Sequence, residues 1–174
     1  MTPQDDSLIP RIAIGDWVDA GIDWLKTNLS WLFDLLRTVM SFLVDNLTEL
    51  LLLVPALVAI PLFALLALTL RSWKLAVGTL IGFLLVLSME QWETMMQTMA
   101  LVLVATVFAV LIAVPLGVLA AISSTVSAIV KPIMDFMQTM PAFVYLIPAV
   151  IFFSIGVVPG IFATIIFALP PGVR

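Results

Sequence analysis

The chain has 174 residues, of which 63% are hydrophobic and only 10% are charged, and its mean hydropathy is +1.26. A typical soluble domain carries roughly 25% charged residues, so this composition excludes a water-soluble protein and predicts an all-α integral membrane protein. The chain contains no Cys and no His, which excludes disulfide frameworks, thiol nucleophiles and the usual zinc and haem ligands. No basic patch suggests nucleic acid.

The N-terminal region is acidic and predicts a tail followed by an amphipathic helix. Residues 1–49 hold eight of the eleven carboxylates but only three of the seven basic residues. Residues 1–15 are polar, contain two prolines and predict a flexible tail. Over residues 16–46 the polar side chains recur every three or four positions, which is one face of an α-helix.

The opposite face of that helix is apolar and includes Trp17, Trp24 and Trp31. A wide apolar side with a narrow polar stripe suits the membrane interface, where Trp rings also prefer to lie. We therefore expect residues 16–46 to form an amphipathic interfacial helix. Its acidic stripe favours a position outside the cytoplasmic leaflet, whose lipids are anionic. The alternative is an amphipathic helix packed on a soluble partner.

Residues 50–174 predict a transmembrane domain of about five helices. Uncharged stretches of this length can cross a hydrocarbon core of roughly 30 Å. The turns between them are a basic Arg71–Lys74, an acidic Glu90–Glu93, a polar Ser123–Ser127 and a Gly156–Gly160 breaker. The predicted spans are about 50–70, 72–89, 95–122, 133–155 and 161–171.

The distribution of Lys and Arg predicts the orientation. One side of the predicted bundle collects Arg71, Lys74, Lys131 and Arg174, whereas the other side collects Arg37 alone. Because cytoplasmic loops are enriched in basic residues, we expect the N-terminus outside and the C-terminus in the cytoplasm.

Chemistry inside the membrane has few candidates. The chain has no phosphate-binding P-loop and no serine near a plausible base, so catalysis is not expected. Asp135 is the one acidic residue beside a span core, and such a residue is a functional candidate. The favoured interpretation is structural: we expect Asp135 at the N-terminal end of its helix, paired with Lys131 four residues earlier.

Around Asp135 the predicted span 133–155 carries a stripe with spacings of three and four residues. One interpretation is that this stripe lines a solute path, where broken helices expose backbone carbonyls. The other is that Gln138 and Tyr145 form hydrogen bonds to a neighbouring helix. The residues alone leave both open. Beside Met134, the stripe comprises Gln138, Pro141, Tyr145, Pro148 and Phe152.

Three runs in the last forty residues resemble a known family. They are Met137–Pro148 (MQTMPAFVYLIP), Gly156–Gly160 (GVVPG) and Thr164–Pro171 (TIIFALPP). Together they closely resemble the permease subunit of glycine betaine/proline ABC importers. Ala113–Gly117 (AVPLG) and Lys131–Asp135 (KPIMD) fit the same family. The resemblance is specific over about residues 94–174 and looser before them.

This resemblance implies the N-terminal portion of a type I ABC importer permease in a bacterial inner membrane. Two permease copies would form the pathway, and two cytoplasmic ATPase subunits would bind ATP, so that no cofactor is expected in this chain. A substrate-binding protein outside would deliver betaine, proline or a related osmolyte. In the family, a cytoplasmic loop that docks on the ATPase follows the match to Leu169–Pro171. We therefore expect a truncated permease, or a second polypeptide that supplies the rest.

Two other functions remain as alternatives. One is a non-transporting membrane scaffold or regulatory subunit that uses the N-terminal helix as a sensor or clamp. The other is a free-standing secondary carrier or channel. The absence of charges in the span interiors argues against ion coupling, and therefore against a carrier.

Overall fold

The structure, a computed structural model, describes residues 14–141 and 143–174, and every regular element within them is a helix. Residues 1–13 of the predicted tail lie outside the described residues, and Ile14 and Gly15 open the first helix. The eight helices are α1 Ile14–Asn28, α2 Ser30–Leu52, α3 Ala56–Leu70, α4 Trp73–Ser88, α5 Trp92–Ile122, α6 Ser124–Thr139, α7 Phe143–Phe153 and α8 Val157–Val173.

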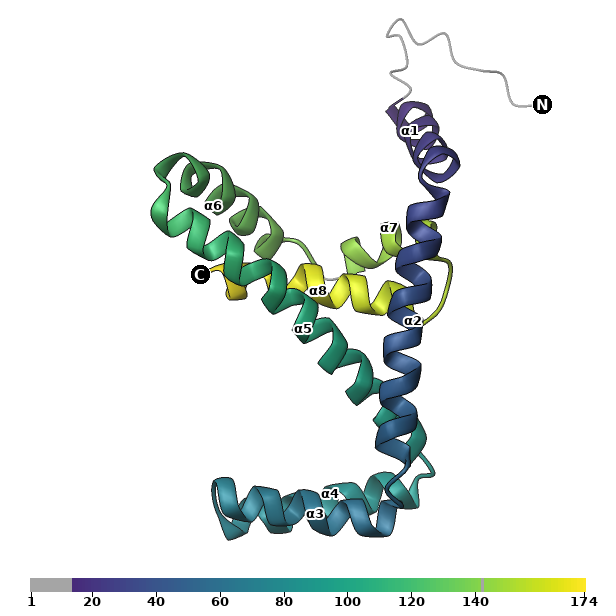
Figure 1. Ribbon diagram of the computed structural model, residues 1–174, viewed down its shortest axis with the longest axis vertical. Coiled ribbons are helices and arrows are strands. Elements are labelled where there is room, and N and C mark those ends of the chain that lie inside the picture. The colour runs from purple at the N-terminus through teal and green to yellow at the C-terminus, as the bar shows by residue number, and fades with distance from the viewer. Residues whose placement is uncertain (1–13, 142) are drawn as a thin grey trace, which may run out of the picture.

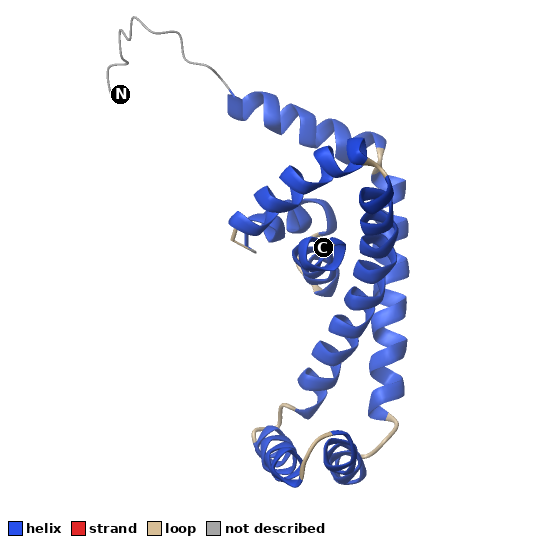
Figure 2. Cartoon of the chain, turned by 90° about the vertical axis from the view of Figure 1, so that its left-hand side faces the viewer, coloured by secondary structure: helices blue, strands red, loops and turns tan. Residues whose placement is uncertain are grey.

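The helices run in two main directions (Figure 1). α3, α4 and α8 lie roughly parallel, α5 runs obliquely beside α8, and α2 crosses one end of this set almost at a right angle. Figure 2 shows α3 and α4 nearly end-on, as a hairpin that stands apart from α8. The axes of α2 and α3 differ by 93°. α2 therefore runs across one end of α3, α4 and α8.

Small residues allow α5 and α8 to pack closely. Ala105, Ala109 and Ala113 follow one another at four-residue intervals on α5 and are all buried. Gly117 continues the series: a Cβ atom there would lie 2.9 Å from the carbonyl oxygen of Val173. On α8, a Cβ atom at Gly172 would lie 2.9 Å from that of Ala113. Such series of small residues let membrane helices approach closely and gain dispersion energy.

The buried core lies where α2, α7 and α8 meet α5. α2 contributes Met40 and Val44, on the side opposite its exposed Trp31. The remaining members are Ala100, Val104, Ala105, Ala109, Phe153, Val158, Ile161 and Ile165. The amphipathic helix therefore directs part of its apolar side at its own protein.

The prediction of a single helix over residues 16–46 is wrong, because two helices, α1 and α2, cover these residues. The chain bends at Leu29, between α1 and α2. Just before the bend, Thr27 and Asn28 donate side-chain hydrogen bonds of 2.8 Å to the carbonyls of Asp23 and Trp24. Side-chain donors that compete in this way for backbone acceptors often bend helices. α2 then continues to Leu52, beyond the predicted end.

The spans predicted over 50–70 and 133–155 are also interrupted. In the first, α2 ends at Leu52 and α3 begins after Pro55. In the second, Met140 has extended backbone angles (φ −87°, ψ 136°) immediately before Pro141. Proline disfavours a helical conformation in the preceding residue, which explains both positions. Other prolines, such as Pro115, lie within continuous helices.

The links at the other helix ends follow local sequence. Ser72 and Ser123 cap α4 and α6, since their hydroxyls accept bonds from Leu75 N and Val126 N. The turn predicted over Ser123–Ser127 is shorter than expected. Only Ser123 lies outside a helix, and α6 begins at the next residue. After α4, Glu90 has φ 57° and the amide of Gln91 donates to Val86, a Schellman-type helix end.

The predicted breaker at Gly156–Gly160 also lies elsewhere than expected. The break covers Ser154–Gly156, with Ser154 at φ 64°, whereas Pro159 and Gly160 lie inside α8. Proline is tolerated in the first turn of a helix because the amide it lacks would have no partner there. α8 therefore begins four residues before the predicted span 161–171.

Most large apolar side chains of the described residues are exposed to the surroundings, including Leu65 on α3 and Leu85 on α4. Such a surface is stable only in an apolar solvent, so the chain is an all-α membrane protein. Among the described helices, only α5 is by itself long and apolar enough to cross a bilayer. The number of spans rises to three if each bent pair, α2–α3 and α6–α7, counts as one span. The five-span count stays a prediction.

We predict that Ala105→Leu destabilises the fold, whereas Val107→Leu does not. Ala105 is 0% exposed and Val107 is 57% exposed on the same helix. Three extra carbons at a closely packed site cost about 1–3 kcal/mol. The thermal unfolding midpoint of the purified chain in detergent measures the effect. Equal midpoints for the two variants would show that α5 is not closely packed at Ala105.

Candidate functional site

The candidate pathway residues lie on both sides of the α6–α7 break. Gln138 is in the last turn of α6, Pro141 is in the link, and Tyr145, Pro148 and Phe152 are on α7. α6 and α7 differ in direction by 97°. The five residues therefore do not form one continuous stripe, as a single helix over 133–155 would have placed them.

Tyr145 connects the two helices. Its hydroxyl donates a 2.6 Å hydrogen bond to the backbone carbonyl of Met137, and the side chain is half-buried. Met137 is in the last turn of α6, where carbonyls lack partners within the helix. The phenol therefore supplies a donor to a helix end, which is a packing role that holds α7 against α6.

Phe152 belongs to an aromatic cluster rather than to an open surface. Its ring stacks on Phe33 of α2, with centroids 4.7 Å apart. Phe33 also meets Phe153 edge to face, and Phe153 stacks on Phe162 of α8 at 4.3 Å. Aromatic pairs at these separations add about 0.5–1.5 kcal/mol each beyond burial. The cluster anchors the end of α7 between α2 and α8.

The other three candidates, Gln138, Pro141 and Pro148, are exposed on this chain. An exposed amide such as that of Gln138 is costly against lipid unless water or another polar group meets it. The structure thus separates the stripe into two packing residues, Tyr145 and Phe152, and three residues available to a solute or a neighbouring helix.

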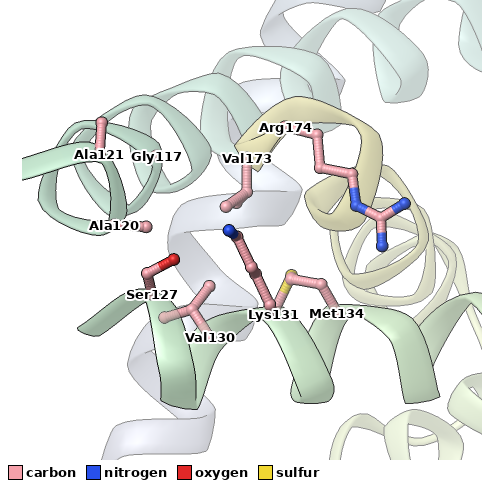
Figure 3. Close-up of a pocket in the computed structure, with 9 residues that line it drawn as sticks. All are labelled: Gly117, Ala120, Ala121, Ser127, Val130, Lys131, Met134, Val173 and Arg174. Atoms are coloured by element: carbon pink, nitrogen blue, oxygen red, sulfur yellow. The ribbon is translucent and has the colours of Figure 1, made fainter. Parts of the chain in front are cut away.

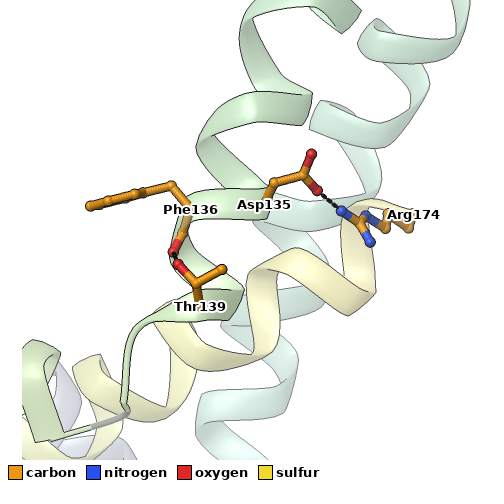
Figure 4. Close-up of polar contacts among 4 residues, drawn as sticks. All are labelled: Asp135, Phe136, Thr139 and Arg174. Carbon is orange, nitrogen blue, oxygen red and sulfur yellow. Dashed lines mark hydrogen bonds and ion pairs between the residues drawn. The ribbon is translucent and has the colours of Figure 1, made fainter.

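The ionic partner predicted for Asp135 is wrong. The carboxylate of Asp135 pairs with the guanidinium of Arg174 at the end of α8 (Figure 4), not with Lys131. Asp135 also lies in the C-terminal half of α6, because α6 begins at Ser124 and not near Ile133. The pair joins residues 39 positions apart. Both side chains are more than half exposed, so its stabilising effect is small.

Beside this pair lies a cavity of about 260 Å³ between the ends of α5, α6 and α8. Ser127 and Lys131, four residues apart on α6, point into it beneath Val173 (Figure 3). Sequence reasoning missed this site, because only the fold brings the end of α8 over α6. The four-residue spacing of Ser127 and Lys131 was the one signal available.

The helical fold and the exposed apolar surface define an α-helical membrane protein. The glycine betaine transport system permease protein OpuAB of Bacillus subtilis is 42% identical over 166 residues, which are 95% of this chain and 59% of that protein. The glycine betaine/proline betaine permease protein ProW of Escherichia coli is 41% identical over 174 residues, 100% of this chain and 48% of that protein.

A third relative, the glycine betaine/carnitine transport permease protein GbuB of Listeria monocytogenes, is 42% identical over 95% of this chain and 60% of its own length. Comparison with protein-family models gives no match. The chain spans about half to three fifths of the length of these relatives. Over nearly all of its own length it is homologous to permeases of glycine betaine transport systems.

We predict that Tyr145→Phe loosens the α6–α7 junction. Loss of the bond to Met137 leaves a carbonyl without its donor, at a cost of about 1 kcal/mol. Hydrogen–deuterium exchange should rise in peptides that cover the end of α6 and α7. Thr164→Val is the control, since the hydroxyl of Thr164 bonds only to Gly160 within α8. Unchanged exchange in Tyr145→Phe would contradict the connecting role.

Proposed function

We propose that this chain is a membrane-spanning permease component of an ATP-driven importer for glycine betaine and related solutes. The observation that carries the proposal is the 41–44% identity to glycine betaine permeases over 95–100% of the chain. These relatives are named as transport permeases for glycine betaine, proline betaine and carnitine. All three carry a positively charged, methylated nitrogen, which defines the proposed class of solute.

The proposed partners follow from the likeness to permeases of transport systems. A cytoplasmic ATPase would bind ATP and supply the energy. An external binding protein would deliver the solute, and a second permease copy would complete the pathway. Because the chain matches only part of each relative, these assignments concern the complete transporter.

The arrangement of the helices supports an orientation with the N-terminus outside. In Figure 1 the α3–α4 turn, the α5–α6 junction and the C-terminus lie on the left side, whereas the α1–α2, α2–α3, α4–α5 and α7–α8 links lie on the right. The left-hand elements carry Arg71, Lys74, Lys131 and Arg174. By the positive-inside rule, the left side would be the cytoplasmic side in this proposal.

In the same orientation α2 would lie along the outer membrane surface, because it is nearly perpendicular to α3. Trp17, Trp24 and Trp31 are exposed on α1 and α2, as expected for anchors at an interface. This supports the interfacial role of residues 16–46, whereas α3, α4, α5 and α8 would cross. At 15–17 residues, α3, α4 and α8 are roughly 23–26 Å long, so the bilayer beside them would be thin.

The proposed solute path runs along the broken helix pair α6–α7. Gln138, Pro141 and Pro148 would face the solute, and Tyr145 and Phe152 would hold the pair in position. The extended backbone of Met140, just before Pro141, lies outside a regular helix, as backbone does at the midplane sites of other transporters.

The proposal can be tested with a chimera. In it, the aligned 166 residues of this chain replace the corresponding part of the Bacillus subtilis permease. We expect the chimera to restore uptake of radiolabelled glycine betaine in cells without their own betaine importers. The unaltered permease and an empty vector are the controls. A chimera that is inserted in the membrane but imports nothing would contradict the proposed function.

Within that chimera, Gln138→Leu should lower the uptake rate by about tenfold, the equivalent of one lost polar contact. Gln97→Leu is the matched control, because Gln97 is also exposed but lies in the first turns of α5, away from the break. Equal uptake by both variants would remove Gln138 from the path.

A further inference from the structure

The cavity between the ends of α5, α6 and α8 combines charge with an apolar wall. One side is formed by Gly117, Ala120 and Ala121 of α5, and the other by Ser127, Val130, Lys131 and Met134 of α6, with Val173 and Arg174 above. No Asp or Glu side chain is among these lining residues. The cavity therefore offers a lysine ammonium, a serine hydroxyl and a nearby guanidinium to a ligand.

Lys131 is the group that this arrangement leaves without an anion. Asp135, four residues further along α6, is the carboxylate best placed to pair with it. That carboxylate is instead bound by Arg174 (Figure 4), and within residues 14–141 and 143–174 Lys131 makes no ion pair. Among these side chains, the two cations and one carboxylate leave a net positive charge. Figure 3 shows the Lys131 ammonium and the Ser127 hydroxyl directed into the same space.

We infer that this cavity binds the phosphate of an anionic phospholipid. A phosphodiester would accept hydrogen bonds from Lys131 and Ser127, and the charge of Arg174 would add attraction. The volume of about 260 Å³ holds a phosphate together with glycerol carbons, which the wall of Ala120, Ala121 and Val130 would cover. A free phosphate ion would gain nothing from that apolar wall.

The location agrees with a lipid as the source. The cavity lies at the side of the molecule that carries the basic turns, and basic pockets between membrane helices at the cytoplasmic side are suited to anionic headgroups. The inference rests on placement of the chain in a bilayer and on the proposed orientation of its basic turns. It does not depend on which solute, if any, is transported.

The test is native mass spectrometry of the purified 174-residue chain with phosphatidylglycerol or phosphatidylcholine. We expect retention of phosphatidylglycerol in preference to phosphatidylcholine, whose choline is repelled by Lys131. Lys131→Gln should weaken phosphatidylglycerol binding about fivefold, as expected for one cation near a headgroup. Lys131→Arg should restore it. Lys74→Gln is the matched control, since Lys74 lies in the first turn of α4 and outside the cavity.

Three results would overturn the inference. The first is equal binding of phosphatidylglycerol by the unaltered chain and by Lys131→Gln, whatever the unfolding midpoint of the variant. In that case the ammonium of Lys131 would only offset the partial negative charge of the carbonyls at the end of α8. The second is equal retention of the two lipids. The third is displacement of phosphatidylglycerol by inorganic phosphate, which would make free phosphate the ligand. Far-ultraviolet circular dichroism of each variant identifies misfolding. If Lys131→Gln misfolds, the comparison of the two lipids on the unaltered chain still tests the inference.

Discussion

Close contact between α5 and α8 is the interaction on which the described structure depends. The series Ala105, Ala109, Ala113 and Gly117 removes side-chain bulk from one side of α5, and Gly172 does the same near the end of α8. In lipid, apolar burial does little to hold helices together, so the contact must come from dispersion forces at short range. α2 and α7 then pack on this pair, and both the aromatic cluster and the ionic pair of Asp135 depend on its geometry.

Prolines produce the bends between these helices. Each proline lacks an amide hydrogen and also disfavours a helical conformation in the residue before it. Pro55 ends the course of α2 and sets α3 at 93° to it. Pro141 separates α6 from α7 in the same way. Irregular backbone at such places is tolerated in a membrane only where protein or water meets it. The broken pair α6–α7 is the place that we propose for a polar path.

The two ends of the molecule differ in chemistry, which is consistent with a protein that faces two compartments. At one end α2 presents an acidic stripe and exposed indole rings. At the other end, Lys131 and Arg174 line a cavity, and Asp135 forms an ion pair with Arg174 alone.

Composition and periodicity alone determined the class of the protein, the amphipathic character of residues 16–46 and the position of its longest apolar helix, because these depend on side-chain chemistry at near neighbours. The family resemblance also followed from short runs of residues. Only the tertiary structure decided that Asp135 pairs with Arg174 and not with Lys131, since the two partners are 39 residues apart. It likewise decided that Tyr145 bonds to Met137 across a bend, and that Ser127 and Lys131 share a cavity with the end of α8. Such contacts depend on how helices cross, and a helical period in the sequence does not contain that information.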